Sequence, residues 1–193
     1  MKIEEVKDYI LGLLNEKLDS QLYYHNIDHT LDVYNNALIF TEKEKLSFEE
    51  QSLVLTAALF HDSGMLKSYD HHEDASAEIA KLTLPDFDYS KEEIRGICKI
   101  ILASKPDVTP ETNCEKILKD ADLNYLGRKD YFIIAQKLRL EWDIKNINTF
   151  SLKEWYEFQI NYLKNHKFYT KSAIELREEQ KIKNLKQIER LFK

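Results

Sequence analysis

The sequence has few of the residues that form tight turns: four glycines and three prolines among 193 residues. A fold built from hairpins needs such residues at its turns, so their scarcity argues against strands. Charged residues make up 32% of the chain and apolar residues 43%, which suits amphipathic helices. No domain boundary is visible, and the length suits one compact domain. We expect a single-domain, all-α helical bundle.

Cysteine and concentrated positive charge are also lacking. Cys98 and Cys114 form no CxxC pair, so the sequence indicates neither a disulfide framework nor a thiolate zinc site. The formal net charge is −6, without a large block of lysine or arginine. A nucleic acid polymer is excluded as a partner, because binding a phosphate backbone needs a dense positive surface. A small phosphorylated molecule remains compatible.

No apolar run approaches the roughly 20 residues of a membrane span, and the stretch MKIEEVKDYI lacks the apolar core of a signal peptide. We therefore expect a cytoplasmic protein without a membrane partner.

Helical spacing of apolar residues predicts the secondary structure. The expected helices span about 3–18, 26–40, 48–62, 72–83, 90–103, 113–127, 129–145, 150–164 and 171–191. In the second helix His29 extends the inward stripe of Val33, Ala37 and Phe40.

The third helix is apolar nearly all round from Leu53 to Phe60, so it should lie at the centre of the fold. Gly64 is expected to end it, with His61 and Asp62 in its last turn. The last helix keeps an apolar stripe for packing or for a homodimer contact, made of Ile174, Ile182, Leu185, Ile188 and Leu191.

Five of the six histidines precede residue 73, namely His25, His29, His61, His71 and His72. A single core histidine is more often a hydrogen-bonded structural residue than a metal ligand. Asp122, however, shares helical spacing with Leu118 and Leu126, and a buried unpaired carboxylate costs several kcal/mol in order of magnitude. The stretch KDADLNYLG places no basic residue on that stripe by our interpretation. A divalent metal shared with His29, His61 and Asp62 would compensate the charge.

Two imidazoles and two carboxylates suit Mn(II), Fe(II), Co(II), Ni(II) or Zn(II), and Mg(II) less well. Four protein ligands leave positions on the ion for water and substrate, as a catalytic site requires.

Three motifs carry a resemblance to a known family. They are Tyr24-His25-Asn26-Ile27-Asp28-His29, His61-Asp62 and Asp120-Ala121-Asp122-Leu123, which resemble the HD superfamily of metal-dependent phosphohydrolases. The resemblance covers about residues 20–145 and leaves about 146–193 as a helical extension. It implies His29, His61, Asp62 and Asp122 as metal ligands, with Asp62 free to bridge a second ion.

The first motif is also similar to that of cyclic-nucleotide phosphodiesterases, which implies that His25 protonates the leaving oxygen. If the helix begins by residue 25, His25 and His29 share one face. The alternative is a solvent-facing residue near the helix cap.

A second ion would need further ligands. His72 is the candidate, but the stretch Ile100–Lys105 has no histidine where two-metal relatives have them, so we expect one tight ion and at most a weak second ion such as Mg(II).

Glu73 either orients the attacking water or stabilises the helix dipole. Lys105 and Arg128 either bind substrate phosphate or are ordinary surface cations. His71 and His166 are expected at the surface.

The resemblance implies hydrolysis of a phosphoester, in a small substrate of the nucleotide type, by a metal-activated water. Cyclic nucleotides and nucleoside monophosphates both fit. The alternative is a metal- and nucleotide-binding sensor without turnover. Oxygen chemistry at a di-iron site would need about six protein ligands and is disfavoured.

Overall fold

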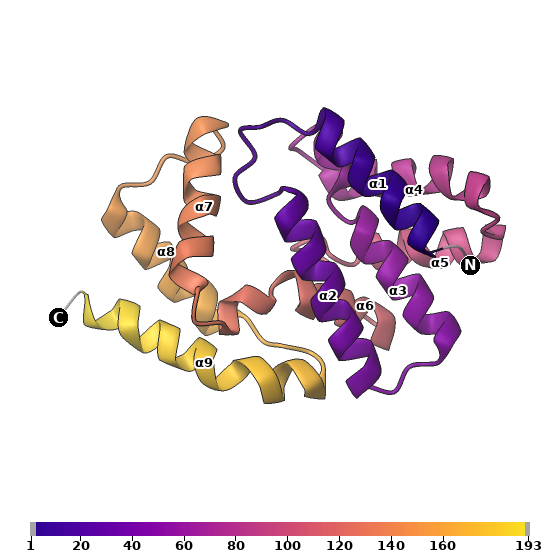
Figure 1. Ribbon diagram of the computed structural model, residues 1–193. Helices are drawn as coiled ribbons and strands as arrows, with labels where there is room; N and C mark the ends of the chain where they lie inside the picture. Colours follow the sequence, from indigo (N-terminus) through magenta and orange to yellow (C-terminus); the bar gives the residue numbers. More distant parts are fainter. Residues whose placement is uncertain (1–2, 192–193) are drawn as a thin grey trace.

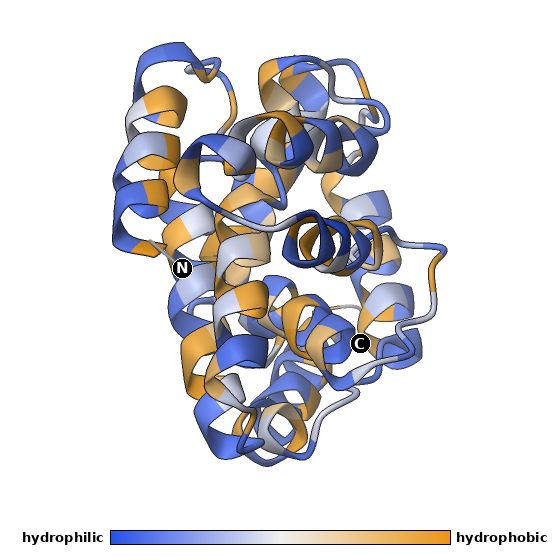
Figure 2. Cartoon of the chain, turned by 90° about the vertical axis from the view of Figure 1, so that its right-hand side faces the viewer, coloured by the Kyte–Doolittle hydropathy of each residue, from blue (hydrophilic) through white to orange (hydrophobic). Residues whose placement is uncertain are grey.

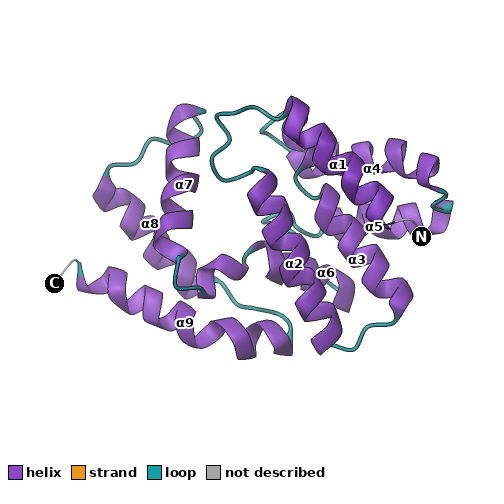
Figure 3. Cartoon of the chain, viewed as in Figure 1, coloured by secondary structure: helices purple, strands orange, loops and turns teal. Residues whose placement is uncertain are grey.

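The computed structural model describes residues 3–191, and this range contains helices but no strand (Figure 3). Its α-helices are α1 (Ile3–Lys17), α2 (Ile27–Lys43), α3 (Phe48–Phe60), α4 (His72–Thr83), α5 (Lys91–Leu102), α6 (Asn113–Asp122), α7 (Tyr131–Ile144), α8 (Leu152–Asn165) and α9 (Lys171–Arg190). Short 3₁₀ helices are η1 (Ser63–Leu66), η2 (Leu84–Phe87) and η3 (Asn124–Gly127). The all-α prediction is confirmed.

Local sequence sets where several helices begin. Ser47, Ser90, Thr112 and Ser151 each form a capping box with the glutamate three residues later, at the starts of α3, α5, α6 and α8. In a capping box the two residues satisfy backbone N–H groups that the first turn leaves unpaired. Asn26 caps α2 by accepting a hydrogen bond from the backbone N–H of His29.

Helix α3 lies at the centre, as predicted, and it packs against α1, α2, α5 and α6. The run from Val54 to Phe60 is buried. Most other helices have an apolar side and a hydrophilic side (Figure 2). The inward face of α2 includes His29, Val33, Ala37 and Phe40, which confirms the predicted stripe.

In the described part of the chain no helix has both the length and the apolar composition needed to cross a bilayer.

The end of α3 differs from the prediction. The helix stops at Phe60, so His61 is its C-cap and Asp62 lies in the turn before η1. Gly64 belongs to η1 and has no left-handed backbone, so it does not end the helix in the expected way. Its role is close packing, because a Cβ there would lie 1.9 Å from the carbonyl oxygen of His72 at the start of α4.

The predicted helix over 113–127 is wrong in its last five residues, 123–127. Helix α6 ends at Asp122, and η3 follows. The Asn124 side chain donates a hydrogen bond of 2.8 Å to the carbonyl oxygen of Ala121. Such local side-chain bonds compete with helix continuation. Gly127 then allows close contact with α9, since a Cβ there would lie 2.3 Å from the carbonyl oxygen of Arg177.

Helices α7, α8 and α9 form an arm beside the body made of α1 to α6 (Figure 1). Helix α9 packs against η3 and α8, as expected for a docked helix. The predicted stripe on α9 is only partly correct: Ile188 is buried and Leu185 is half-buried, but Ile174, Ile182 and Leu191 are exposed.

The inward face of α9 instead includes two polar residues, Lys181 and Asn184. Lys181 Nζ donates to the carbonyl oxygen of His166 at 2.8 Å. Asn184 Nδ2 donates to the carbonyl oxygens of Leu126 and Arg128, each at 2.9 Å. Because their side chains are hydrogen-bonded, these two polar residues can be buried without a large cost in free energy. The spacing of apolar residues carries no information about such hydrogen bonds.

Candidate metal centre and active site

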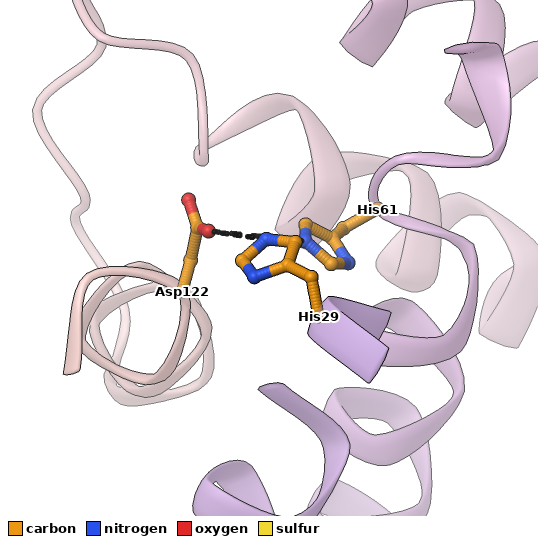
Figure 4. Close-up of side chains that lie close together, drawn as sticks. All are labelled: His29, His61 and Asp122. Atoms are coloured by element: carbon orange, nitrogen blue, oxygen red, sulfur yellow. Dashed lines mark hydrogen bonds and ion pairs between the residues drawn. The ribbon is translucent and has the colours of Figure 1, made fainter. Parts of the chain in front are cut away.

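Three predicted ligands come together from three helix ends. His29 lies in the first turn of α2, His61 caps the end of α3, and Asp122 is the last residue of α6 (Figure 4). Their ligand atoms all lie within 4.8 Å of one another. The two Nε2 atoms are 3.3 Å apart, and His29 Nε2 is 3.1 Å from Asp122 Oδ1.

Asp62 completes the cluster. Its Oδ2 lies 3.1 Å from His61 Nε2 and 3.3 Å from His29 Nε2. This oxygen is buried and accepts no hydrogen bond from the described residues. A buried carboxylate oxygen without a hydrogen bond, facing two imidazole nitrogens, fits a divalent cation. His29, His61, Asp62 and Asp122 are therefore the residues suited to hold it.

A hydrogen bond on the side of the ring away from the cluster fixes the orientation of His61. His61 Nδ1 is 2.8 Å from the carbonyl oxygen of Ala58 and donates to it, so in the neutral ring Nε2, which faces the cluster, carries the lone pair. Metal-binding histidines usually have such a partner on the other ring nitrogen.

Without an ion, protons balance the carboxylates. Burial disfavours the charged form of His29, but Asp122 and Asp62 outweigh it and raise the pKa of His29 to about 10. Burial likewise opposes the charge on Asp62, yet His61, His29 and His72 hold the pKa of Asp62 well below its usual value. Charge of both signs is thus concentrated where an ion would bind.

His25 does not share a helical face with His29, because α2 begins only at Ile27. It lies in the preceding loop, yet its side chain is only 13% exposed. His25 Nδ1 bonds to Glu141 Oε1. The backbone N–H groups of Tyr24 and His25 donate to Glu141 Oε2 at 2.7 and 3.0 Å, and Tyr69 Oη donates to Oε1 at 2.8 Å. Glu141 therefore orients His25.

Sequence reasoning missed Glu141, which is fully buried in α7. A weak signal exists: Glu141 is three residues after Leu138 and adjacent to Trp142, so it falls on the half-buried side of its helix. Burial raises the pKa of Glu141, but the hydrogen bonds from His25, Tyr24 and Tyr69 outweigh it and hold this pKa below its ordinary value.

A cavity of about 800 Å³ opens at this cluster. At one end it is lined by His25, Asp62, His72, Glu73 and Asp122. Its other lining side chains include seven aromatic residues: Tyr24, Tyr69, Tyr125, Trp142, Phe158, Tyr162 and Tyr169.

His72 lies beside Asp62, and Glu73 lines the cavity next to it. His72 Nε2 lies 3.4 Å from Asp62 Oδ1 and 3.8 Å from Glu73 Oε1. Burial lowers the pKa of His72, but Asp62 and Glu73 outweigh it and raise this pKa to about 9.

The two predicted phosphate-binding cations are not among the described residues that line the cavity. Lys105 Nζ pairs with Asp74 at 2.7 Å. Arg128 pairs with Asp32 and Asp130, each at 2.5 Å. Both cations therefore form ion pairs with carboxylates that are not among the described residues lining the cavity.

A different cation, Lys119, lies near Asp122 and lines the cavity, so the expectation of no basic residue there is wrong. Its Nζ donates to the carbonyl oxygens of Ala103, Lys105 and Val108 at 3.2, 2.7 and 2.5 Å. An ammonium group has three N–H donors, so these bonds use them all and leave Asp122 to the cluster.

Of the two histidines expected at the surface, His71 is exposed. The prediction for His166 is wrong: it is half-buried and lines the cavity. Both of its ring nitrogens are buried and have no hydrogen-bond partner within residues 3–191. Burial and the charges of Lys181 and Lys119 lower its pKa to about 4.

The HD domain family model matches residues 26–123, about half of the chain and all four candidate ligands. The protein belongs to the HD domain family. An uncharacterized protein of Clostridium beijerinckii is 34% identical over 104 residues, which make up 51% of this chain and 66% of that protein. The match thus spans just under two thirds of this relative's length.

Two solved structures share the fold along nearly the whole chain. A predicted HD superfamily hydrolase from an uncultured Thermotogales bacterium has a TM-score of 0.65 at 23% identity, covering 96% of this chain and 90% of that one. Bacillus subtilis YpgQ, solved in complex with ADP, has a TM-score of 0.66 at 20% identity, covering 98% and 97%. The similarity includes the arm.

Proposed function

We propose that this protein is a metal-dependent phosphohydrolase that cleaves a phosphoester bond of a small nucleotide. The observation that carries the proposal is the His29, His61, Asp62 and Asp122 cluster at one end of a cavity, with His25 held beside it. The ADP complex of YpgQ supports a nucleotide as the substrate class.

His29, His61, Asp62 and Asp122 would hold a divalent ion, which would supply Lewis-acid chemistry by lowering the pKa of a water and neutralising phosphoryl charge. His25 supplies the proton for the leaving oxygen. Its Nδ1 is committed to Glu141, so Nε2 is the nitrogen available in the cavity. The Glu141 carboxylate fixes the ring and faces the charge of the protonated imidazole, as a carboxylate does behind other catalytic histidines.

Glu73 is proposed to orient the attacking water from beside Asp62. His72 is proposed as a ligand for a weak second ion such as Mg(II), shared with Asp62, because its Nε2 lies 3.4 Å from Asp62 Oδ1. The main ion is one of Mn(II), Fe(II), Co(II), Ni(II) or Zn(II), since the ligands combine nitrogen and oxygen.

One observation favours a second candidate function, a sensor that binds metal and nucleotide without turnover. Lys105 and Arg128 are paired with acidic residues away from the cavity, so neither is available to stabilise phosphoryl charge during reaction. A sensor would bind nucleotide tightly and release no product.

The test is product release from a panel of cyclic and linear nucleotides, with metal-stripped protein refilled with Mn(II). Asp122→Ala should lose bound metal and turnover together, because it removes a ligand. His25→Ala should keep the metal and lose turnover by roughly 100-fold or more. Normal turnover by metal-free Asp122→Ala protein would rule out the mechanism, while tight nucleotide binding without turnover by the wild type would favour the sensor.

A further inference from the structure

The cavity has two halves of different origin. The metal-binding half comes from the body and, apart from His25, from the range 26–123 that matches the family. The other half is lined from the arm by Trp142 in α7, Phe158 and Tyr162 in α8, and His166 in the loop before α9. These arm residues lie outside the range that matches the family.

The arm half suits a flat ring. Trp142 and Phe158 meet edge to face with ring centroids 5.6 Å apart, and Phe158 and Tyr162 are stacked on each other at 6.1 Å with an interplanar angle of 22°. All three rings line the cavity, and aromatic side chains that line a binding site bind nucleobases by stacking, whatever the base. An aliphatic or sugar-only substrate would leave this aromatic surface poorly matched.

His166 adds hydrogen-bonding capacity to this aromatic wall. Both of its ring nitrogens are buried without a partner in the described chain, although buried polar groups are generally satisfied. Desolvation and the charges of Lys181 and Lys119 keep its pKa near 4, so at neutral pH the ring is uncharged. A neutral imidazole presents one donor and one acceptor, which is the pattern of a base edge.

The loop that carries His166 is held in place from both sides. The backbone N–H groups of Tyr169 and Thr170 donate to Asp120 at 2.9 and 2.7 Å, which joins the loop to α6. The carbonyl oxygen of His166 accepts the bond from Lys181 in α9. A binding group fixed in advance loses little freedom when a ligand arrives.

We propose that the arm half of the cavity, lined by Trp142, Phe158, Tyr162 and His166, is a nucleobase-binding subsite in which His166 hydrogen-bonds to the edge of the base. This subsite deepens the proposed function and rests on it for the position of the phosphate at the metal end. Binding of the base itself needs no metal.

The experiment therefore uses nucleosides, which carry the base without phosphate. Adenosine, guanosine, cytidine and uridine are titrated into metal-stripped protein by calorimetry, with ribose 5-phosphate as the ligand that lacks a base. His166→Phe keeps a ring of similar size but removes both nitrogens, and His166→Gln restores a donor and an acceptor. His71→Asn is the matched control, because it removes an exposed histidine and asparagine tolerates the left-handed backbone at that position (φ 55°).

At least one nucleoside should bind the wild type. His166→Phe should weaken that binding by on the order of tenfold, the effect of losing a buried hydrogen bond. His166→Gln should recover most of the affinity and His71→Asn should match the wild type. Urea unfolding of each variant verifies that the fold is intact.

Equal nucleoside affinity in wild type and His166→Phe would overturn the role of His166. Hydrolysis of ribose 5-phosphate as efficient as that of nucleoside monophosphates, with no nucleoside binding, would overturn the subsite and leave the phosphohydrolase intact. Nucleoside binding that depends on His166, without turnover of any nucleotide, would support the subsite and remove the proposed reaction.

Discussion

Glu141 carries its charge where no water reaches it, and four donors share its two oxygens. Glutamine at this position keeps the size and one acceptor but removes the charge that faces His25. We expect Glu141→Gln to reduce kcat by roughly 10–100-fold, the range seen when a partner behind a functional histidine is lost. KM and metal content should change little, because neither the ligands nor the cavity wall are altered.

Steady-state kinetics and metal analysis of purified protein provide the measurement. Glu179→Gln is the control, since Glu179 is exposed and pairs only with Lys183 among the contacts described. A variant with wild-type kcat would mean that Glu141 supports the loop around His25 structurally and takes no part in proton transfer.

At the scale of the elements, the contact between η1 and α4 sets the geometry on one side of the metal cluster. A Cβ at Gly64 would lie 1.9 Å from the His72 carbonyl oxygen and 2.8 Å from the Ser76 nitrogen, both backbone atoms that cannot move aside cheaply. Gly64→Ala should therefore destabilise the fold by about 1–3 kcal/mol and move His72 away from Asp62. Urea unfolding measures the first effect, and metal titration should detect the second as weaker binding.

Gly12→Ala is the matched control within α1. A Cβ there meets no described atom within 4 Å, so alanine should stabilise the helix by about 0.5–1 kcal/mol. Unchanged stability in Gly64→Ala would show that the η1–α4 contact is looser than the distances indicate.

The helices themselves could be predicted from sequence, because apolar spacing and capping residues are local signals. The helix ends beside the candidate metal site could not be predicted in this way. Helix α6 stops after Asp122 through the Asn124 side chain, and α3 stops before Asp62 without a left-handed glycine. The end of α6 depends on one side-chain bond and the end of α3 has no left-handed residue, so the spacing of apolar residues marks neither of them.

For the whole molecule, Glu141 also joins the arm to the body, because α7 supplies the carboxylate and the loop before α2 supplies the N–H groups. Its pKa is lowered in the folded protein from an ordinary value of 4.5. A depressed carboxyl pKa contributes stability that is fully present above that ordinary value and is lost as the pH falls through the folded-state pKa.

We therefore expect the wild type to lose about 2 kcal/mol from this group in acid, a figure typical of hydrogen bonds to a charged partner. The loss should begin below about pH 4.5 and be absent in Glu141→Gln. Urea unfolding of both proteins at pH 7 and in steps below pH 5 gives the comparison. Parallel pH curves for the two proteins would show that the joint contributes nothing to global stability.

The candidate metal-binding cluster could be predicted from the sequence because His29, His61, Asp62 and Asp122 fall in motifs that resemble those of a known family. The residues of the cavity wall could not be predicted from the sequence. Glu141, Lys119 and His166 come from segments whose neighbours in space are distant along the chain, and His166 sits among lysines that suggest a surface. Only the docking of the arm converts these residues into parts of a site.

The four candidate ligands are also synthesised at different times, because they are spread along the chain. His29, His61 and Asp62 leave the ribosome well before Asp122, which is the last residue of α6. A nascent chain that ends before residue 122 has an incomplete set, and a site that forms only in the folded state holds its ion only then. An ion that needs all four residues would therefore be bound only after the body has been synthesised.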